Sequence, residues 1–162
     1  MTLLLPQVVL VVNVSPSDLA AEVNYREMRQ LADAFGSLPG GLFRLLLLPC
    51  EQFQGAQRFA PMRWRKKQMD EAQLLAHAAQ RGLLPPSTRM LARGDVNGPA
   101  AQALFTFLKV SVGDSSDIGG NFCKFLVAKD GRVFGRYCPP LRPALLQPAI
   151  TKLLQEEAPA AQ

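Results

Sequence analysis

Residues 8–25, VVLVVNVSPSDLAAEVNY, predict a buried strand, a sharp loop and the first turns of a helix. Val8–Val12 is apolar and rich in β-branched side chains, as strands are, and it is too short to span a membrane. The segment Ser15–Ser17 ends this strand. Asp18 then stands where a helix N-cap is expected, because aspartate is a preferred N-cap residue. Residue 18 therefore lies where a helix dipole stabilises an anion or a thiolate.

The rest of the chain alternates predicted helices with predicted strands. Residues 42–48 are apolar nearly throughout, which is typical of an interior strand in a sheet covered on both faces. The alternation predicts one α/β domain over residues 1–157, with 158–162 as a tail. The further predicted strands are 123–128 and 132–137, joined by a turn at 129–131, and the predicted helices are 20–35, 70–81, 99–109 and 143–157.

Composition limits the class of protein. The chain has 162 residues, of which 48% are apolar, and this suits one domain with its own core. Residues 1–7, MTLLLPQ, lack the basic region of a secretory signal and the arginine-rich pattern of a transit peptide. Three cysteines without a CxxC pair argue against a disulfide framework and against a zinc site. We therefore expect no metal or cofactor, and a reducing intracellular compartment, either the mitochondrion or the cytoplasm.

Residues 53–69, FQGAQRFAPMRWRKKQM, form a basic segment without an acidic residue. Its five basic side chains account for the whole excess of 18 basic over 13 acidic residues. Such a segment can bind RNA, anionic lipid or an acidic protein face, or can be a solvated loop. One tryptophan among arginines favours a protein interface, because RNA-binding surfaces use several stacking aromatic residues. The predicted partner-binding residues of this segment are Arg58, Arg63, Trp64, Arg65, Lys66 and Lys67.

Several short motifs, in order along the chain, resemble those of glutathione peroxidases. Residues 13–19, NVSPSDL, are similar to that family's N-V-A-S-x-C-G, and Tyr25 follows as a tyrosine does there. The resemblance implies a thioredoxin-like fold, in which a central mixed sheet has helices on both faces. The other matches are PCEQF at 49–53, DVNG at 95–98, GNFCKFL at 120–126 and RYCP at 136–139.

The working residues of that family are a tetrad of cysteine or selenocysteine, glutamine, tryptophan and asparagine. The resemblance places Asp18, Gln52, Gly120 and Asn121 at these positions. Peroxide reduction needs a thiolate or selenolate that is oxidised and then reduced again, and a carboxylate cannot undergo that cycle. We therefore predict no catalytic residues and a chain that is not an enzyme, with Gln52 and Asn121 kept as structural amides.

The resulting functional prediction is an inactive peroxidase-like subunit of a larger intracellular protein assembly. One alternative is a residual thiol peroxidase that uses Cys50 or Cys123, and another is an RNA-binding module at residues 58–67. Cys123 lies two residues after Asn121, so strand alternation would place both on one face.

Other expectations concern the ends and the assembly. The chain begins close to its first core strand, without the hairpin that the family places there. We expect Leu3, Leu4 and Leu5 either to meet a partner or to fold back over the uncovered sheet. The alignment puts His77 where thioredoxin-dependent members have a resolving cysteine, and the short loop 111–119 argues against the family's tetramer.

Overall fold

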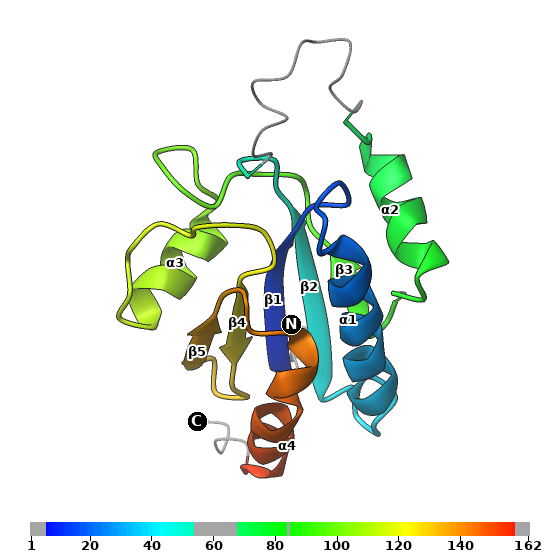
Figure 1. The fold of residues 1–162 in the computed structure, drawn as a ribbon. Coiled ribbons are helices and arrows are strands. Elements are labelled where there is room, and N and C mark those ends of the chain that lie inside the picture. Colours follow the sequence, from blue (N-terminus) through cyan, green and yellow to red (C-terminus); the bar gives the residue numbers. More distant parts are fainter. Residues whose placement is uncertain (1–5, 54–67, 84, 158–162) are drawn as a thin grey trace, which may run out of the picture.

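The computed structural model of the chain describes residues 6–53, 68–83 and 85–157. Among these residues, five strands form one mixed sheet in the order β3-β2-β1-β4-β5, with helices on both faces (Figure 1). No helix of these three ranges is long and apolar enough to cross a membrane. The strands are β1 (Val8–Val14), β2 (Phe43–Pro49), β3 (Thr88–Met90), β4 (Lys124–Val127) and β5 (Val133–Tyr137). The helices are α1 (Ala21–Phe35), α2 (Glu71–Gln80), α3 (Ala103–Ser111), the 3-10 helix η3 (Pro143–Leu146) and α4 (Gln147–Gln155).

The central strand is β1, which the opening stretch of sequence predicts. It pairs in parallel with β2 along its whole length and antiparallel with β4. Its side chains alternate between two apolar cores. Val12 lies in the core beneath α1 and α4, whereas Val11 lies in the core beneath α3. Because both faces are covered, every residue of the strand except Asn13 is apolar, and the sequence does not alternate.

Three elements differ from the sequence-based prediction. The edge strand β3 was not predicted, because three residues carry no measurable period. Helix α3 begins at Ala103 rather than at residue 99, since Asp95 and Ala101 first form an isolated bridge. The closing helix is divided into η3 and α4, and Pro148, which has no N–H to donate, lies in the first turn of α4.

A buried carboxylate joins the closing segment to α1. Glu27 is only 2% exposed, forms an ion pair with Arg142 and accepts a hydrogen bond from the Ala144 backbone N–H at 3.2 Å. Since a buried charge is tolerated only when it is paired, this contact fixes where the chain runs before η3. Residues 139–142 of that run line the site described next.

Candidate active site

A pocket of about 420 Å³ lies where the chain passes from β1 into α1. It brings together three of the four positions predicted from the family resemblance, namely Asp18, Gly120 and Asn121. Asp18 is about a hundred positions from Gly120 and Asn121 in sequence, and they meet because β4 pairs with β1. The remaining lining residues are Ala20, Val23, Asn24, Phe122, Pro139, Pro140, Leu141 and Arg142.

Asp18 is not the N-cap of α1, which corrects the sequence-based expectation. The helix begins three residues later, at Ala21, and its N-cap residue, Ala20, makes no side-chain capping bond. Instead, the Asp18 carboxylate accepts hydrogen bonds from the Ala20 backbone N–H and from Nδ2 of Asn121, both at 2.8 Å. Asp18 therefore joins the turn before α1 to the loop before β4.

Asn121, which lines the pocket, carries a buried acceptor without a partner in the described part of the chain. It is 7% exposed, and its Oδ1 has no hydrogen-bond partner among the described residues. Its orientation is defined by Asp18, because a carboxylate only accepts and the amide must turn its NH₂ group toward it. A buried acceptor without a partner is costly unless a ligand or water supplies a donor.

Asn13 holds the loop that carries Asn121, a role that sequence analysis did not identify. Its Nδ2 donates to the Gly120 carbonyl at 3.0 Å, and its Oδ1 accepts from the Cys123 backbone N–H at 3.0 Å. Between them, Phe122 adopts a φ of 60° and packs edge-on against Tyr25. A buried asparagine inside an otherwise apolar strand was the available signal.

The positive φ of Phe122 also decides where Cys123 lies. Phe122 enters the core beneath α1, whereas Cys123 enters the opposite core beneath α3, together with Cys50. The expected alternation of Asn121 and Cys123 onto one face is therefore wrong. Residues 121–123 precede β4 and are not extended like a strand, so strand alternation does not apply there.

Gln52 is not part of the pocket lining. Its Oε1 accepts from the backbone N–H groups of Val96 and Asn97, at 2.7 and 3.0 Å, and its Nε2 donates to the Asn97 carbonyl. The buried thiol of Cys50 also donates to this Oε1, at 3.8 Å. Burial raises the pKa of the Cys50 thiol, which makes it a poor nucleophile at neutral pH.

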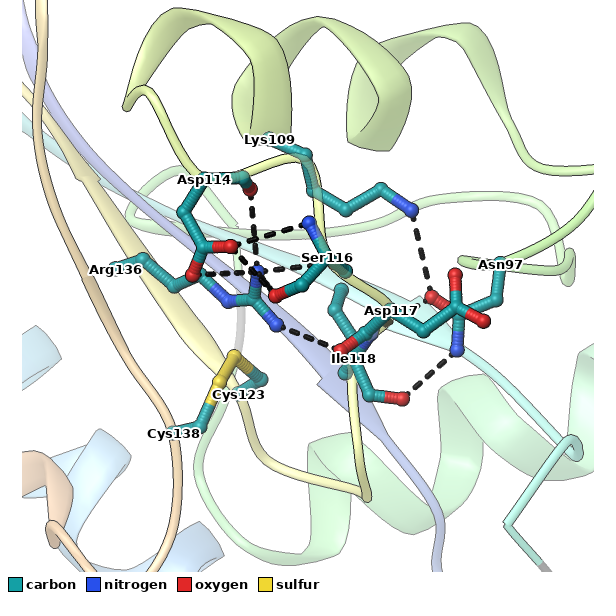
Figure 2. A network of polar contacts seen from close by, with 9 residues as sticks. All are labelled: Asn97, Lys109, Asp114, Ser116, Asp117, Ile118, Cys123, Arg136 and Cys138. Atoms are coloured by element: carbon teal, nitrogen blue, oxygen red, sulfur yellow. Dashed lines mark hydrogen bonds and ion pairs between the residues drawn. A yellow bond between two sulfur atoms is a disulfide. The ribbon is translucent and has the colours of Figure 1, made fainter.

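Cys123 and Cys138 form a disulfide at the open end of the β4–β5 hairpin (Figure 2). The number and spacing of the cysteines argued against a disulfide framework, and this bond corrects that expectation for two of the three. Lys124 of β4 pairs with Tyr137 of β5. The residues next to this pair at the open end of the hairpin, Cys123 and Cys138, therefore lie opposite each other. The turn at residues 130–131 lies midway between the two cysteines, and this sequence signal could have predicted the bond. Cys123 is fully buried, whereas Cys138 is half-buried.

Arg136 fixes the loop beside this disulfide. Its side chain is 10% exposed, forms an ion pair with Asp114 at 3.0 Å and donates to the carbonyls of Asp114, Ser116 and Asp117 (Figure 2). Hydrogen bonds from Ser116, together with Arg136, lower the pKa of Asp114. At the other end of the loop, Asn97 exchanges two hydrogen bonds of 2.8 Å with the Ile118 backbone.

His77 packs edge-on against Tyr25 rather than beside a cysteine, with ring centroids 5.1 Å apart. Burial and the nearby Arg81 charge lower the pKa of His77, so the ring is neutral at pH 7. The described residues contain no cluster of side chains able to hold a metal ion. The predicted partner-binding residues, Leu3, Leu4, Leu5, Arg58, Arg63, Trp64, Arg65, Lys66 and Lys67, lie outside the described residues.

Solved structures support the predicted thioredoxin-like fold. The crystal structure of Trgpx in apo form is similar with a TM-score of 0.68 and 25% identity, covering 95% of this chain and 84% of that one. A thioredoxin family thiol:disulfide interchange protein from Chlorobium tepidum gives a TM-score of 0.58 at 13% identity, covering 93% and 81%. The thioredoxin-like prediction is confirmed.

Comparisons of sequence identify relatives over nearly the whole chain. A family model described as glutathione peroxidase matches residues 2–109. "Glutathione peroxidase 1, mitochondrial" of Chlamydomonas reinhardtii is 38% identical over 148 residues, which are 91% of this chain and 67% of that protein. "Probable phospholipid hydroperoxide glutathione peroxidase" of Citrus sinensis is 34% identical over 151 residues, which are 92% of this chain and 81% of that protein.

These relatives contradict the prediction that the chain is not an enzyme, because both are named as peroxidases and align with more than nine tenths of it. That prediction depended mainly on residues 18 and 120, and it did not foresee the Cys123–Cys138 disulfide. The extent of the family match and the identity along the aligned residues lead to one conclusion: the chain belongs to the glutathione peroxidase family.

Proposed function

We propose that this protein reduces hydroperoxides with electrons from an external thiol, and that Cys123 and Cys138 are its redox pair. The observation that carries the proposal is the Cys123–Cys138 disulfide at the open end of the β4–β5 hairpin, in the core beneath α3. Phe122 and Pro139, which line the pocket, are the sequence neighbours of the two cysteines. A dithiol supplies the two electrons that a carboxylate at residue 18 cannot. The names of the relatives support hydroperoxides as the substrate class.

Burial assigns the two cysteines different roles. Cys138 is half-buried and is the attacking residue, whereas Cys123 is fully buried and is the resolving residue. Arg136 and Cys138 both pack against the core beneath α3, so the partly exposed sulfur lies on the same side of the hairpin as this guanidinium. Cys50, whose pKa is raised by burial, is not used.

The proposed reaction balances with one hydroperoxide and two external thiols. The Cys138 thiolate attacks the terminal oxygen, an S–O bond forms, the O–O bond breaks and the alcohol leaves after taking up a proton. Cys123 then attacks the sulfenic sulfur of Cys138, which forms the disulfide and releases water. Two external thiols reduce the disulfide and are themselves oxidised to a disulfide.

The pocket offers one group that can orient the substrate. The Oδ1 atom of Asn121 is an acceptor without a partner among the described residues, and a hydroperoxide O–H is a donor. Asp18 holds the Asn121 amide in this orientation and takes no part in the redox step. Asp18 and Asn121 thus act as positioning and binding residues.

The test is peroxide consumption by the purified protein with excess thiol reductant, using hydrogen peroxide and a lipid hydroperoxide as separate substrates. We expect turnover by the wild type and by Cys50→Ser, and loss of turnover in Cys138→Ser. Cys123→Ser should stop after the first step and accumulate a sulfenic acid on Cys138, which a dimedone probe detects by mass spectrometry.

Two outcomes would overturn this assignment. Turnover that survives Cys123→Ser and Cys138→Ser but is lost in Cys50→Ser would move the chemistry to Cys50. A wild-type protein that consumes no hydroperoxide with any thiol reductant would refute the proposed activity.

We also propose that the basic segment, residues 53–69, binds an acidic protein partner in a larger assembly. The concentration of the chain's net positive charge in this segment supports the proposal. Trp64→Ala combined with Arg65→Ala should release the protein from the assembly in a pull-down, without changing its circular dichroism. Release by nuclease, or steeply salt-dependent binding to bare RNA, would favour the RNA-binding alternative instead.

For the location of the protein, we propose the mitochondrion or the cytoplasm. Support comes from relatives in Chlamydomonas reinhardtii and Arabidopsis thaliana whose names include "mitochondrial". Fractionation of native cells with an antibody to this chain is the test, and recovery only from the secreted fraction would contradict the proposal.

A further inference from the structure

A second cavity, of about 530 Å³, lies between helix α2 and the edge strand β3. We name it the α2–β3 cavity; it shares no lining residue with the candidate active site. Its volume falls within the usual range for small-molecule sites, roughly 300–1,000 Å³. Most of its lining is apolar and includes Leu75, Ala79, Leu83, Pro85, Pro86 and Met90.

One buried hydroxyl in this lining has no partner. Thr88 is 4% exposed, and its Oγ1 makes no hydrogen bond to any described residue. Thr88 pairs with Leu45 of β2. Leu45 lies in the same core as Ala78 and Leu83, so Thr88 belongs to the face of the sheet that α2 covers. Buried hydroxyls are normally satisfied, and an unsatisfied one beside a cavity indicates a missing polar ligand group.

The charged groups of the cavity are all positive. Among the described residues, Arg44 and Arg89 line it, and no aspartate or glutamate does. Arg44 donates to Oε1 of Gln7 at 3.4 Å, whereas Arg89 forms no ion pair with any residue of the described ranges. The cavity therefore combines an apolar wall with a hydroxyl donor and two guanidinium groups, which suits a ligand with an apolar body and an anionic end.

We propose that the α2–β3 cavity binds an aliphatic monocarboxylate. Its hydrocarbon chain lies along the apolar wall, and its carboxylate accepts hydrogen bonds from Thr88 Oγ1 and from the Arg89 guanidinium. An inorganic anion would leave the apolar wall uncovered, and a plain hydrocarbon would leave the hydroxyl and the guanidinium without a partner. This site is separate from the proposed peroxidase chemistry and does not depend on it.

The test is calorimetric titration of the whole protein with decanoate below its micellar concentration. We expect one saturable site, and binding of decanol about tenfold weaker because it lacks the charge. Thr88→Val removes the hydroxyl but keeps the shape of the side chain, and Arg89→Gln removes the charge. Each substitution should weaken the binding of decanoate about tenfold.

A pair of variants on α2 locates the site. Ala79 lines the cavity at an exposed position, so Ala79→Phe should fill the cavity and abolish binding. Ala76 is also exposed on α2 but does not line the cavity, so Ala76→Phe should bind like the wild type. Repeating the titration on Cys138→Ser separates this site from the redox pair, and unchanged circular dichroism shows that each variant is folded.

Three results would overturn the proposal. The first is that the wild type shows no saturable binding of decanoate. The second is that Ala79→Phe and Ala76→Phe lose affinity equally. The third is that neither Thr88→Val nor Arg89→Gln changes the affinity. Phosphatidylcholine vesicles provide the second arm, because their acyl chains carry no free carboxylate. Binding to vesicles but not to decanoate would replace the monocarboxylate by a membrane surface.

Discussion

Lys124 is a buried amine with no carboxylate partner among the described residues. It is fully buried, its Nζ donates to the Phe122 carbonyl at 2.6 Å, and burial lowers its pKa to about 8. Since the unfolded chain binds this proton more tightly, folding is penalised below the folded pKa, and the penalty disappears as pH rises from about 8 to 10.5. The amine thus makes the protein less stable at neutral pH than at the alkaline end of that window.

The prediction is that Lys124→Met removes this pH dependence. Between about pH 8 and pH 10.5, the unfolding free energy of the wild type should rise by about 3 kcal/mol relative to that of the variant. Urea titrations at several pH values measure it. Burial raises the pKa of Tyr25, so this residue lowers the unfolding free energy at high pH. The effect is the same in both proteins and cancels in the difference between them. Lys152→Met, at an exposed position, is the control. The account would be refuted if the difference in unfolding free energy between the wild type and Lys124→Met did not change with pH.

Asp18 is expected to stabilise the pocket rather than the helix. Asp18→Ala removes the one hydrogen bond that the buried side-chain amide of Asn121 makes among the described residues, and it should cost about 1–3 kcal/mol of unfolding free energy. In a double-mutant cycle, Asn121→Ala should cost clearly less when residue 18 is already alanine. Independent effects of the two substitutions would show that the bond contributes nothing. Asp33→Ala, which breaks only an exposed ion pair with Arg29, should change stability by about 0.5 kcal/mol or less.

At the scale of elements, the loop 112–119 is held by side chains and not by pairing with a strand. Arg136 bonds three of its carbonyls, and the planar guanidinium can span them whereas an ammonium group cannot. Arg136→Lys should therefore speed amide hydrogen exchange in this loop and cost about 1–2 kcal/mol. Arg132→Lys, on the same hairpin but half exposed, is the matched control. Equal exchange in the two variants would contradict this role of Arg136.

At the scale of the whole molecule, the disulfide joins the edge strand β5 to its neighbour β4. Cys123 and Cys138 are separated by 15 residues, and closing such a loop stabilises a protein by about 3 kcal/mol in the chain-entropy estimate. Adding a thiol reductant should lower the urea midpoint of the wild type but not that of Cys123→Ser combined with Cys138→Ser. An identical response of the two proteins would show that the bond does not stabilise the fold.

The elements themselves were largely predictable from sequence. The apolar runs of β1 and β2, the amphipathic helix α1 and the turn of the β4–β5 hairpin carry local signals that survive in the structure. The family motifs then supplied the connectivity, because they occur in order along the chain. The edge strand β3 and the split closing helix were missed, since short elements are decided by the neighbours against which they pack.

The site depended on tertiary structure. By itself, the sequence determined which residue types stand at the family positions, because identity at a position needs no coordinates. It did not determine that Asp18 bonds Asn121 instead of capping α1, that Gln52 turns away from the pocket, or that Phe122 separates Asn121 from Cys123. Each of these depends on partners that are tens of residues away, and hydrogen-bond geometry is set only when the sheet brings them together.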